Sequence, residues 1–71
     1  MYYYAFTYTI VRGKELIDSG PFGVKHEEPR SIEQLKEYVK SWKKDFPDSA
    51  VVQIHALENP SEQDWKLRFG K

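Results

Sequence analysis

Residues 2–12 read Tyr-Tyr-Tyr-Ala-Phe-Thr-Tyr-Thr-Ile-Val-Arg. They include no proline or glycine and are mostly β-branched or aromatic, a composition that predicts a strand. The even-numbered side chains, from Tyr2 to Ile10, are larger and more apolar than the odd-numbered ones, from Tyr3 to Val11. Because successive strand residues face opposite ways, we expect the even face to pack on the core and the odd face to be partly exposed.

A second strand is predicted over residues 15–27, after a hairpin turn in which Gly13 supplies a positive φ. The sequence Gly20-Pro21-Phe22-Gly23 falls inside this range. Proline cannot donate a hydrogen bond to a strand ladder, so we predict an interruption at residues 20–23 and a place at the sheet edge, or at a bulge or bend.

A helix is predicted over residues 32–46. Ser31 and Gln34 match a capping box, in which each side chain accepts a hydrogen bond from the other residue's backbone N–H. The apolar residues that follow recur every three or four positions, which is typical of one buried helix stripe: Ile32, Leu35, Val39, Trp42 and Phe46. Pro47 disfavours helical geometry at the residue before it and predicts the end of the helix.

The segment after the helix predicts a third strand over residues 50–57, an apolar run of strand length. The tail, residues 60–71, is ambiguous. Asn59 as N-cap and Pro60 as first helical residue favour at least one helical turn. Trp65, Leu67 and Phe69 alternate with polar residues, which favours an extended chain, and both interpretations stay open.

These elements predict an α+β fold in a single domain, residues 1–71, because a chain of 71 residues supports one small core. The order is β-β-α-β with a short aromatic C-terminal tail. A crossover that places the third strand beside the first gives strand order 2-1-3, with neighbouring strands antiparallel. The helix then covers one face of the sheet. Whether the tail covers the other face is left open by the sequence.

Composition excludes several classes of protein. Eleven Lys and Arg balance eleven Asp and Glu, which argues against a general polyanion binder. The chain has no cysteine, so it has no disulfide framework and no thiolate site, and a reducing cytoplasm is expected. Residues 1–6 lack the basic region of a signal peptide, and no stretch approaches the length of a membrane span. We expect a soluble, cytoplasmic protein, complete as written.

No catalytic, metal or cofactor site is expected. The compact ionisable cluster is His26-Glu27-Glu28, which a surface position at a strand end explains; His26 and His55 would have to meet across strands to form a site. The serines fall at predicted turns, caps or a polar helix face, where hydroxyl groups serve the backbone. The glycines precede no helix and form no phosphate loop. We therefore predict that the protein is not an enzyme.

Binding to another protein is the function that the residues favour, because a three-stranded sheet with one helix leaves an apolar face uncovered. The predicted contact residues are Tyr3, Val11, Val51, Leu57 and Trp65. One alternative is a nucleic-acid-binding module that uses a basic helix flank, made of Lys36, Lys40, Lys43 and Lys44. The other is a structural homodimer formed by pairing of sheet edges or faces.

The layout resembles that of short uncharacterised proteins encoded by bacteriophages and prophages. The resemblance rests on the aromatic strand at 2–8, the bend at 20–23, the sequence Glu28-Pro29-x-Ser31-Ile32 and the strand at 50–54. It covers residues 2–57, and the tail with Trp65 departs from it. It implies a non-enzymatic accessory protein in the cytoplasm of a bacterial host cell, where it binds and modulates a host protein. Some proteins of this kind inhibit host machinery.

Overall fold

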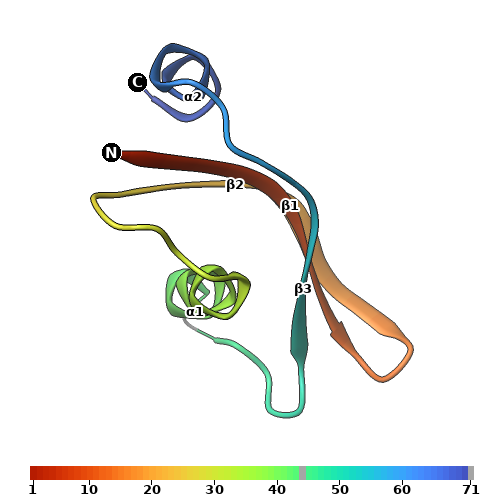
Figure 1. Cartoon of the computed structure of the whole chain (residues 1–71). Helices are drawn as coiled ribbons and strands as arrows, with labels where there is room; N and C mark the ends of the chain where they lie inside the picture. The colour runs from red at the N-terminus through yellow and green to blue at the C-terminus, as the bar shows by residue number, and fades with distance from the viewer. Residues whose placement is uncertain (44, 71) are drawn as a thin grey trace.

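The computed structural model describes residues 1–43 and 45–70, which form a three-stranded sheet with one helix on each face (Figure 1). Strand β1 (Tyr2–Arg12) lies between β2 (Glu15–His26) and β3 (Val51–Glu58), and both neighbours run antiparallel to it. The predicted α+β class and the strand order 2-1-3 are confirmed.

Strand β2 is continuous, so the predicted interruption at residues 20–23 is wrong. Pro21 pairs with Thr7 inside the ladder. It is tolerated because β2 is an edge strand, on which a missing N–H on the outer side removes no ladder bond. The irregularity lies nearer the turn, where the pairing partner changes from Asp18 opposite Ile10 to Leu16 opposite Val11. Gly13 has φ 63° in the turn, as predicted.

Helix α1 (Ile32–Trp42) begins at the predicted residue. The backbone N–H of Gln34 donates to Ser31 Oγ (3.2 Å) and the Ser31 N–H donates to Gln34 Oε1 (2.8 Å), which completes the capping box. The helix ends four residues earlier than predicted. The backbone of Lys43 is extended, with φ −92° and ψ 96°, so this residue lies outside the helix. Its side-chain ammonium contacts Asp18 of β2.

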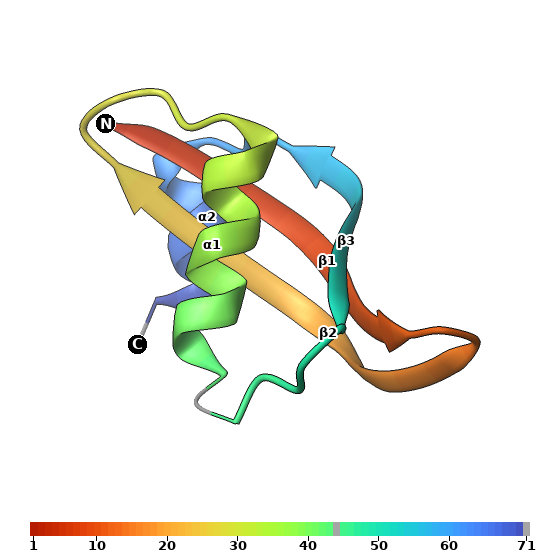
Figure 2. The ribbon, with the colours of Figure 1, turned by 90° about the horizontal axis from the view of Figure 1, so that it is seen from below.

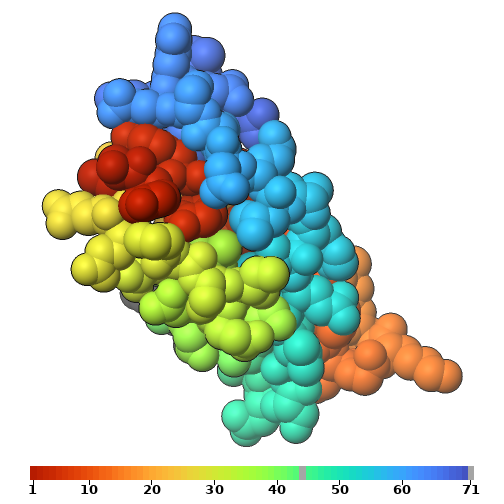
Figure 3. All heavy atoms as spheres, in the orientation of Figure 1, coloured from red at the N-terminus to blue at the C-terminus, as the bar shows by residue number. Residues whose placement is uncertain are grey.

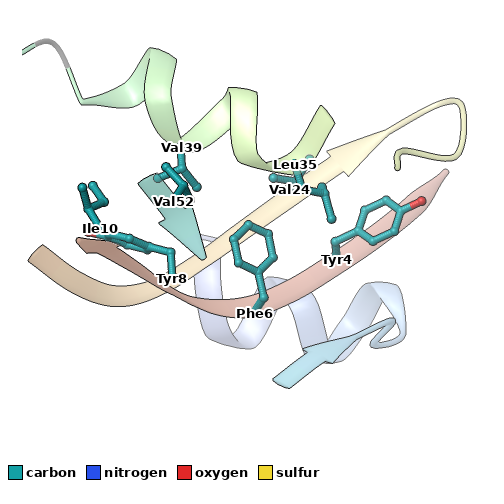
Figure 4. Packing of buried hydrophobic residues seen from close by; sticks show 8 residues of the cluster. All are labelled: Tyr4, Phe6, Tyr8, Ile10, Val24, Leu35, Val39 and Val52. Atoms are coloured by element: carbon teal, nitrogen blue, oxygen red, sulfur yellow. The ribbon is translucent and has the colours of Figure 1, made fainter. Parts of the chain in front are cut away.

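The core lies between α1 and the even face of β1, as predicted. Figure 4 shows Tyr4, Phe6, Tyr8 and Ile10 of β1 on the side of the sheet that faces α1, where Leu35 and Val39 are fully buried. Tyr2, at the start of the same face, is 46% exposed and lies outside the core. Val24 of β2 and Val52 of β3 complete this layer. Phe46 still packs against the core, from the non-helical chain beyond α1.

Residues 62–69 form a second helix, α2 (Glu62–Phe69), so the extended interpretation of the tail is wrong. The cap is Ser61, whose Oγ accepts from the Asp64 N–H (3.2 Å), and not Asn59. Figure 2 shows α1 in front of the sheet and α2 behind it. The sheet is therefore covered on one face by α1 and partly on the other by α2.

Strand β3 runs from Val51 to Glu58, one residue later at each end than predicted. Its pairing with β1 shifts register between Thr7, which pairs with His55, and Ala5, which pairs with Glu58. Ala56 lies in this irregular part and has φ 53°. The regular part of the strand is therefore residues 51–55.

Candidate interaction surface

The face of the sheet opposite α1 consists of rows of residues paired across the strands. Two rows at the N-terminal end of β1 lie under α2: Lys25 with Tyr3, and Gly23 with Ala5 and Glu58. Three further rows follow toward the hairpin turn: Pro21, Thr7 and His55; Ser19, Thr9 and Gln53; and Leu16, Val11 and Val51. The last of these is called the apolar row below. The three rows together are called the open face.

Trp65 anchors α2 to the covered rows. Only 8% of the Trp65 surface is exposed, and its indole N–H donates to the backbone oxygen of Tyr4 (3.1 Å). Its ring lies 5.6 Å from that of Tyr3 and 5.5 Å from that of Phe69. Gly23 is required beneath Phe69, because a Cβ at position 23 would overlap the phenylalanine ring. Trp65 therefore holds α2 against the sheet, as Leu35 and Val39 hold α1. The prediction of one buried stripe is wrong for Ile32 and Trp42, which are more than half exposed.

Two predicted contact residues, Tyr3 and Trp65, are thus engaged within the chain. The Tyr3 hydroxyl also donates to Glu62 Oε1 (2.8 Å). This hydrogen bond raises the pKa of Tyr3 and lowers that of Glu62, because it stabilises the neutral phenol and the ionised carboxylate. The structure places both residues in the attachment of α2.

The apolar row brings two other predicted residues together, Val11 and Val51. Leu16 lies on the other side of Val11 and was not among the predicted contact residues. The sequence did hold a signal for it: with a two-residue turn at positions 13 and 14, residue 12 pairs with 15 and Val11 pairs with Leu16. Leu16 is 59% exposed and Val51 is 53% exposed. Three apolar side chains therefore cross the sheet in one line, with the outer two largely in solvent.

Neutral polar groups lie beside the apolar row. Thr9 Oγ1 is 3.0 Å from His55 Nε2 and donates to Gln53 Oε1 at 3.3 Å.

The fifth predicted contact residue, Leu57, is exposed at the opposite end of β3 from Val51, beyond the register shift. The structure therefore does not bring Leu57 into the apolar row.

The predicted basic flank is balanced by acidic groups. Lys36 lies 3.7 Å from Glu33, and Lys40 lies 3.8 Å from Glu37, each one turn along α1. Lys43 pairs with a strand carboxylate, and Lys44 lies outside the described residues. Mixed charge of this kind is typical of a solvated helix surface.

Asp18 of β2 links the sheet to Lys43, the residue that follows α1. Its Oδ2 accepts from Lys43 Nζ and from the Tyr8 hydroxyl, both at 3.0 Å. Both hydrogen bonds lower the pKa of Asp18 below its usual range, and the one from Lys43 has the larger effect. The pKa of Tyr8 is raised, mainly by burial of its hydroxyl and to a smaller extent by the hydrogen bond to Asp18. The arrangement is a structural link between two elements, in which a carboxylate must stay ionised.

Acid should weaken this link. Because the pKa of Asp18 is lower in the folded chain than the unfolded value of about 3.9, its contribution to stability is present above that value and is lost as the pH falls through the folded pKa. We expect the melting temperature of Asp18→Asn to fall less than that of the native chain between about pH 5 and about pH 2. Asp48→Asn, which removes an exposed turn carboxylate, is the control. An equal acid loss in all three proteins would contradict the prediction.

His26 and His55 do not meet. His26 lies on β2, opposite Tyr2 of β1. His55 lies on β3, opposite Thr7 of β1, so β1 separates the two histidines. Nδ1 of His26 accepts the Glu28 backbone N–H (3.0 Å), which explains the cluster at 26–28 as a turn. Over residues 1–43 and 45–70, no three His, Asp or Glu side chains are grouped closely enough to hold a metal ion.

Comparisons of this chain with protein-family models, with curated proteins and with solved structures found no match. In the part of the chain that the structure describes, neither helix has the length and apolar character needed to cross a membrane.

Proposed function

We propose that this chain is a non-enzymatic binding module that docks onto another protein through its open face, with the apolar row at the centre of the contact. The observation that carries the proposal is the row itself. Leu16, Val11 and Val51 lie side by side on three strands, and two of them are more than half exposed. A contiguous exposed apolar patch of this kind is typical of a protein-binding site.

The chemistry of the open face favours a protein partner over a nucleic acid. None of its nine positions carries Lys, Arg, Asp or Glu. Charged residues are depleted at the centres of protein interfaces, whereas nucleic-acid binding depends on cations facing the phosphates. Hydroxyl, amide and imidazole groups beside the apolar row supply neutral hydrogen-bonding partners. We extend the proposal to the partner that the resemblance to phage proteins implies, a protein of a bacterial host cell.

The experiment is affinity capture from a lysate of the host, with two matched variants. Leu16→Glu combined with Val51→Glu places two charges on the apolar row. Leu67→Glu places one on α2, where Leu67 is 79% exposed and outside the open face. We expect the native chain and Leu67→Glu to retain the same protein, and the double variant to retain at least about tenfold less, because a charge buried in an interface core is costly.

Thermal melts establish that all three proteins are folded, which is expected because the altered side chains are exposed. Retention that is equal in the double variant and the native chain would contradict the proposal. So would retention that disappears steeply with added salt, because an apolar contact is not weakened by screening.

A further inference from the structure

Within residues 1–43 and 45–70, no strand pairs with the outer edge of β3. The strand order is β2-β1-β3, so one side of β3 pairs with β1 and the other faces outward. Six of its eight residues are exposed. Figure 3 shows β3 atoms at the surface between α1 and the tip of the hairpin. An edge strand presents a row of unpaired N–H and C=O groups, which are a template for adding another strand.

The two sheet edges differ in how they are protected. Strand β2 carries Pro21, the charged residues Glu15, Asp18 and Lys25, and the irregularity near Ile17, all of which discourage edge pairing. Strand β3 carries none of these over its regular part. Residues 50–57 include no charged residue and no proline, and Val51, Val52 and Ile54 are β-branched. The edge of β3 is therefore the one suited to receive a strand.

We propose that this edge pairs with a second copy of the chain, as an antiparallel, symmetric β3–β3 contact with Gln53 opposite Gln53. Antiparallel pairing of identical strands is self-complementary and closes at a dimer. Centring at Gln53 uses all of the regular residues 51–55, because it is their midpoint. The net charge of zero removes overall repulsion between copies.

This register places matching side chains opposite one another, since directly opposed residues share a face of the sheet. Val52 of each copy faces Ile54 of the other on the α1 side, where Ile54 is only partly buried in one chain. Val51 faces His55 on the open face. Like charges meet nowhere within residues 51–55. The product is a six-stranded sheet, with both open faces on one side.

The inference goes beyond the proposed function, because it rests on the backbone edge of β3, although Val51, Gln53 and His55 of this strand also belong to the open face. The experiment is a charge exchange at the two-fold axis, measured by sedimentation. The native chain is expected to dimerise with rising concentration. Gln53→Glu and Gln53→Lys should each raise the dissociation constant at least about tenfold, because like charges then face each other. An equal mixture of the two variants should restore the dimer.

Gln53 is exposed, and among the described residues its side chain accepts one hydrogen bond, from Thr9. Circular dichroism should therefore show both variants folded. A native chain that stays monomeric at millimolar concentration would overturn the proposal, and so would dimers that persist in both charge variants.

The absence of cysteine allows a second test. Gln53→Cys should form a disulfide-linked dimer on mild oxidation, because opposed strand residues lie within disulfide reach. Ser19→Cys, on the other edge, should not, and the reverse result would overturn the register.

Discussion

Replacing Leu35 with alanine is expected to lower the free energy of unfolding by about 2–5 kcal/mol. Leu35 is fully buried in the layer between α1 and β1, beside Val39 and Val24. Alanine loses the transfer free energy of the removed methyl groups and leaves a cavity in the small core. Since a domain of 71 residues has a total stability of roughly 4–10 kcal/mol, this one change removes a large part of it.

The matched control is Ile32→Ala on the same helix. Ile32 is 52% exposed, although the sequence pattern places it in the same stripe as Leu35. Urea unfolding followed by circular dichroism measures both changes in free energy. We expect the Ile32 change to cost less than about 1 kcal/mol, because little apolar area is returned to water. Equal losses at the two positions would contradict the assignment of the core.

Replacing Trp65 with alanine is the second change with a large expected effect, about 3–5 kcal/mol. It removes the buried indole, its hydrogen bond to Tyr4 O and its contacts with Tyr3 and Phe69 at once. The interface between α2 and the sheet then loses its central group. Hydrogen exchange should show the greatest loss of protection in residues 62–69, since these depend most directly on the indole.

Leu67→Ala is the control for this change, because Leu67 lies on the solvent side of the same helix. Leucine and alanine also differ only slightly in helix propensity. We expect it to shift stability by no more than about 0.5 kcal/mol. Trp65→Phe should give an intermediate loss, because it keeps an aromatic ring but removes the N–H donor. If Trp65→Ala were no more destabilising than Leu67→Ala, α2 would not be held to the sheet by the indole.

The parts of the fold that sequence alone predicted are those with local causes. The start of α1 depends on Ser31 and Gln34, three residues apart, and both hydrogen bonds of the capping box are present. The buried face of β1 follows from the contrast between its even and odd side chains. The crossover rule predicted that the third strand runs parallel to the second, and the order 2-1-3 was chosen among the arrangements it allows; the structure has that order.

The parts that were missed depend on distant contacts. Trp65 and Phe69 are four residues apart, which suits one side of a helix, but their partners Tyr3 and Gly23 lie far away in the sequence. Alternation in the tail favoured an extended chain while Asn59 and Pro60 favoured a helical turn, and the local sequence could not decide between them. Helix α1 ends early, at Trp42, and the Lys43 side chain beyond it pairs with Asp18, a partner 25 residues away. Pro21 fits an unbroken strand because β2 lies at an edge of the described sheet, a position that the sequence did predict.

The candidate surface was predicted only in part, for the same reason. Val11 and Val51 were identified from strand alternation, and the structure pairs them. Tyr3 and Trp65 were predicted as contact residues for a partner, yet the structure places them against each other. An aromatic residue that is free to bind a partner and one that attaches a helix have the same local sequence signal, and only the tertiary arrangement separates them.

The two indoles of the chain lie on opposite sides of the sheet, Trp42 against Tyr8 and Phe22, and Trp65 against Tyr3 and Phe69. Each is therefore a built-in optical reporter of one layer. In variants that keep a single tryptophan, the emission of Trp42 would follow the α1 layer and that of Trp65 the α2 layer. Stopped-flow fluorescence of such a pair would reveal whether the layers assemble together or in succession.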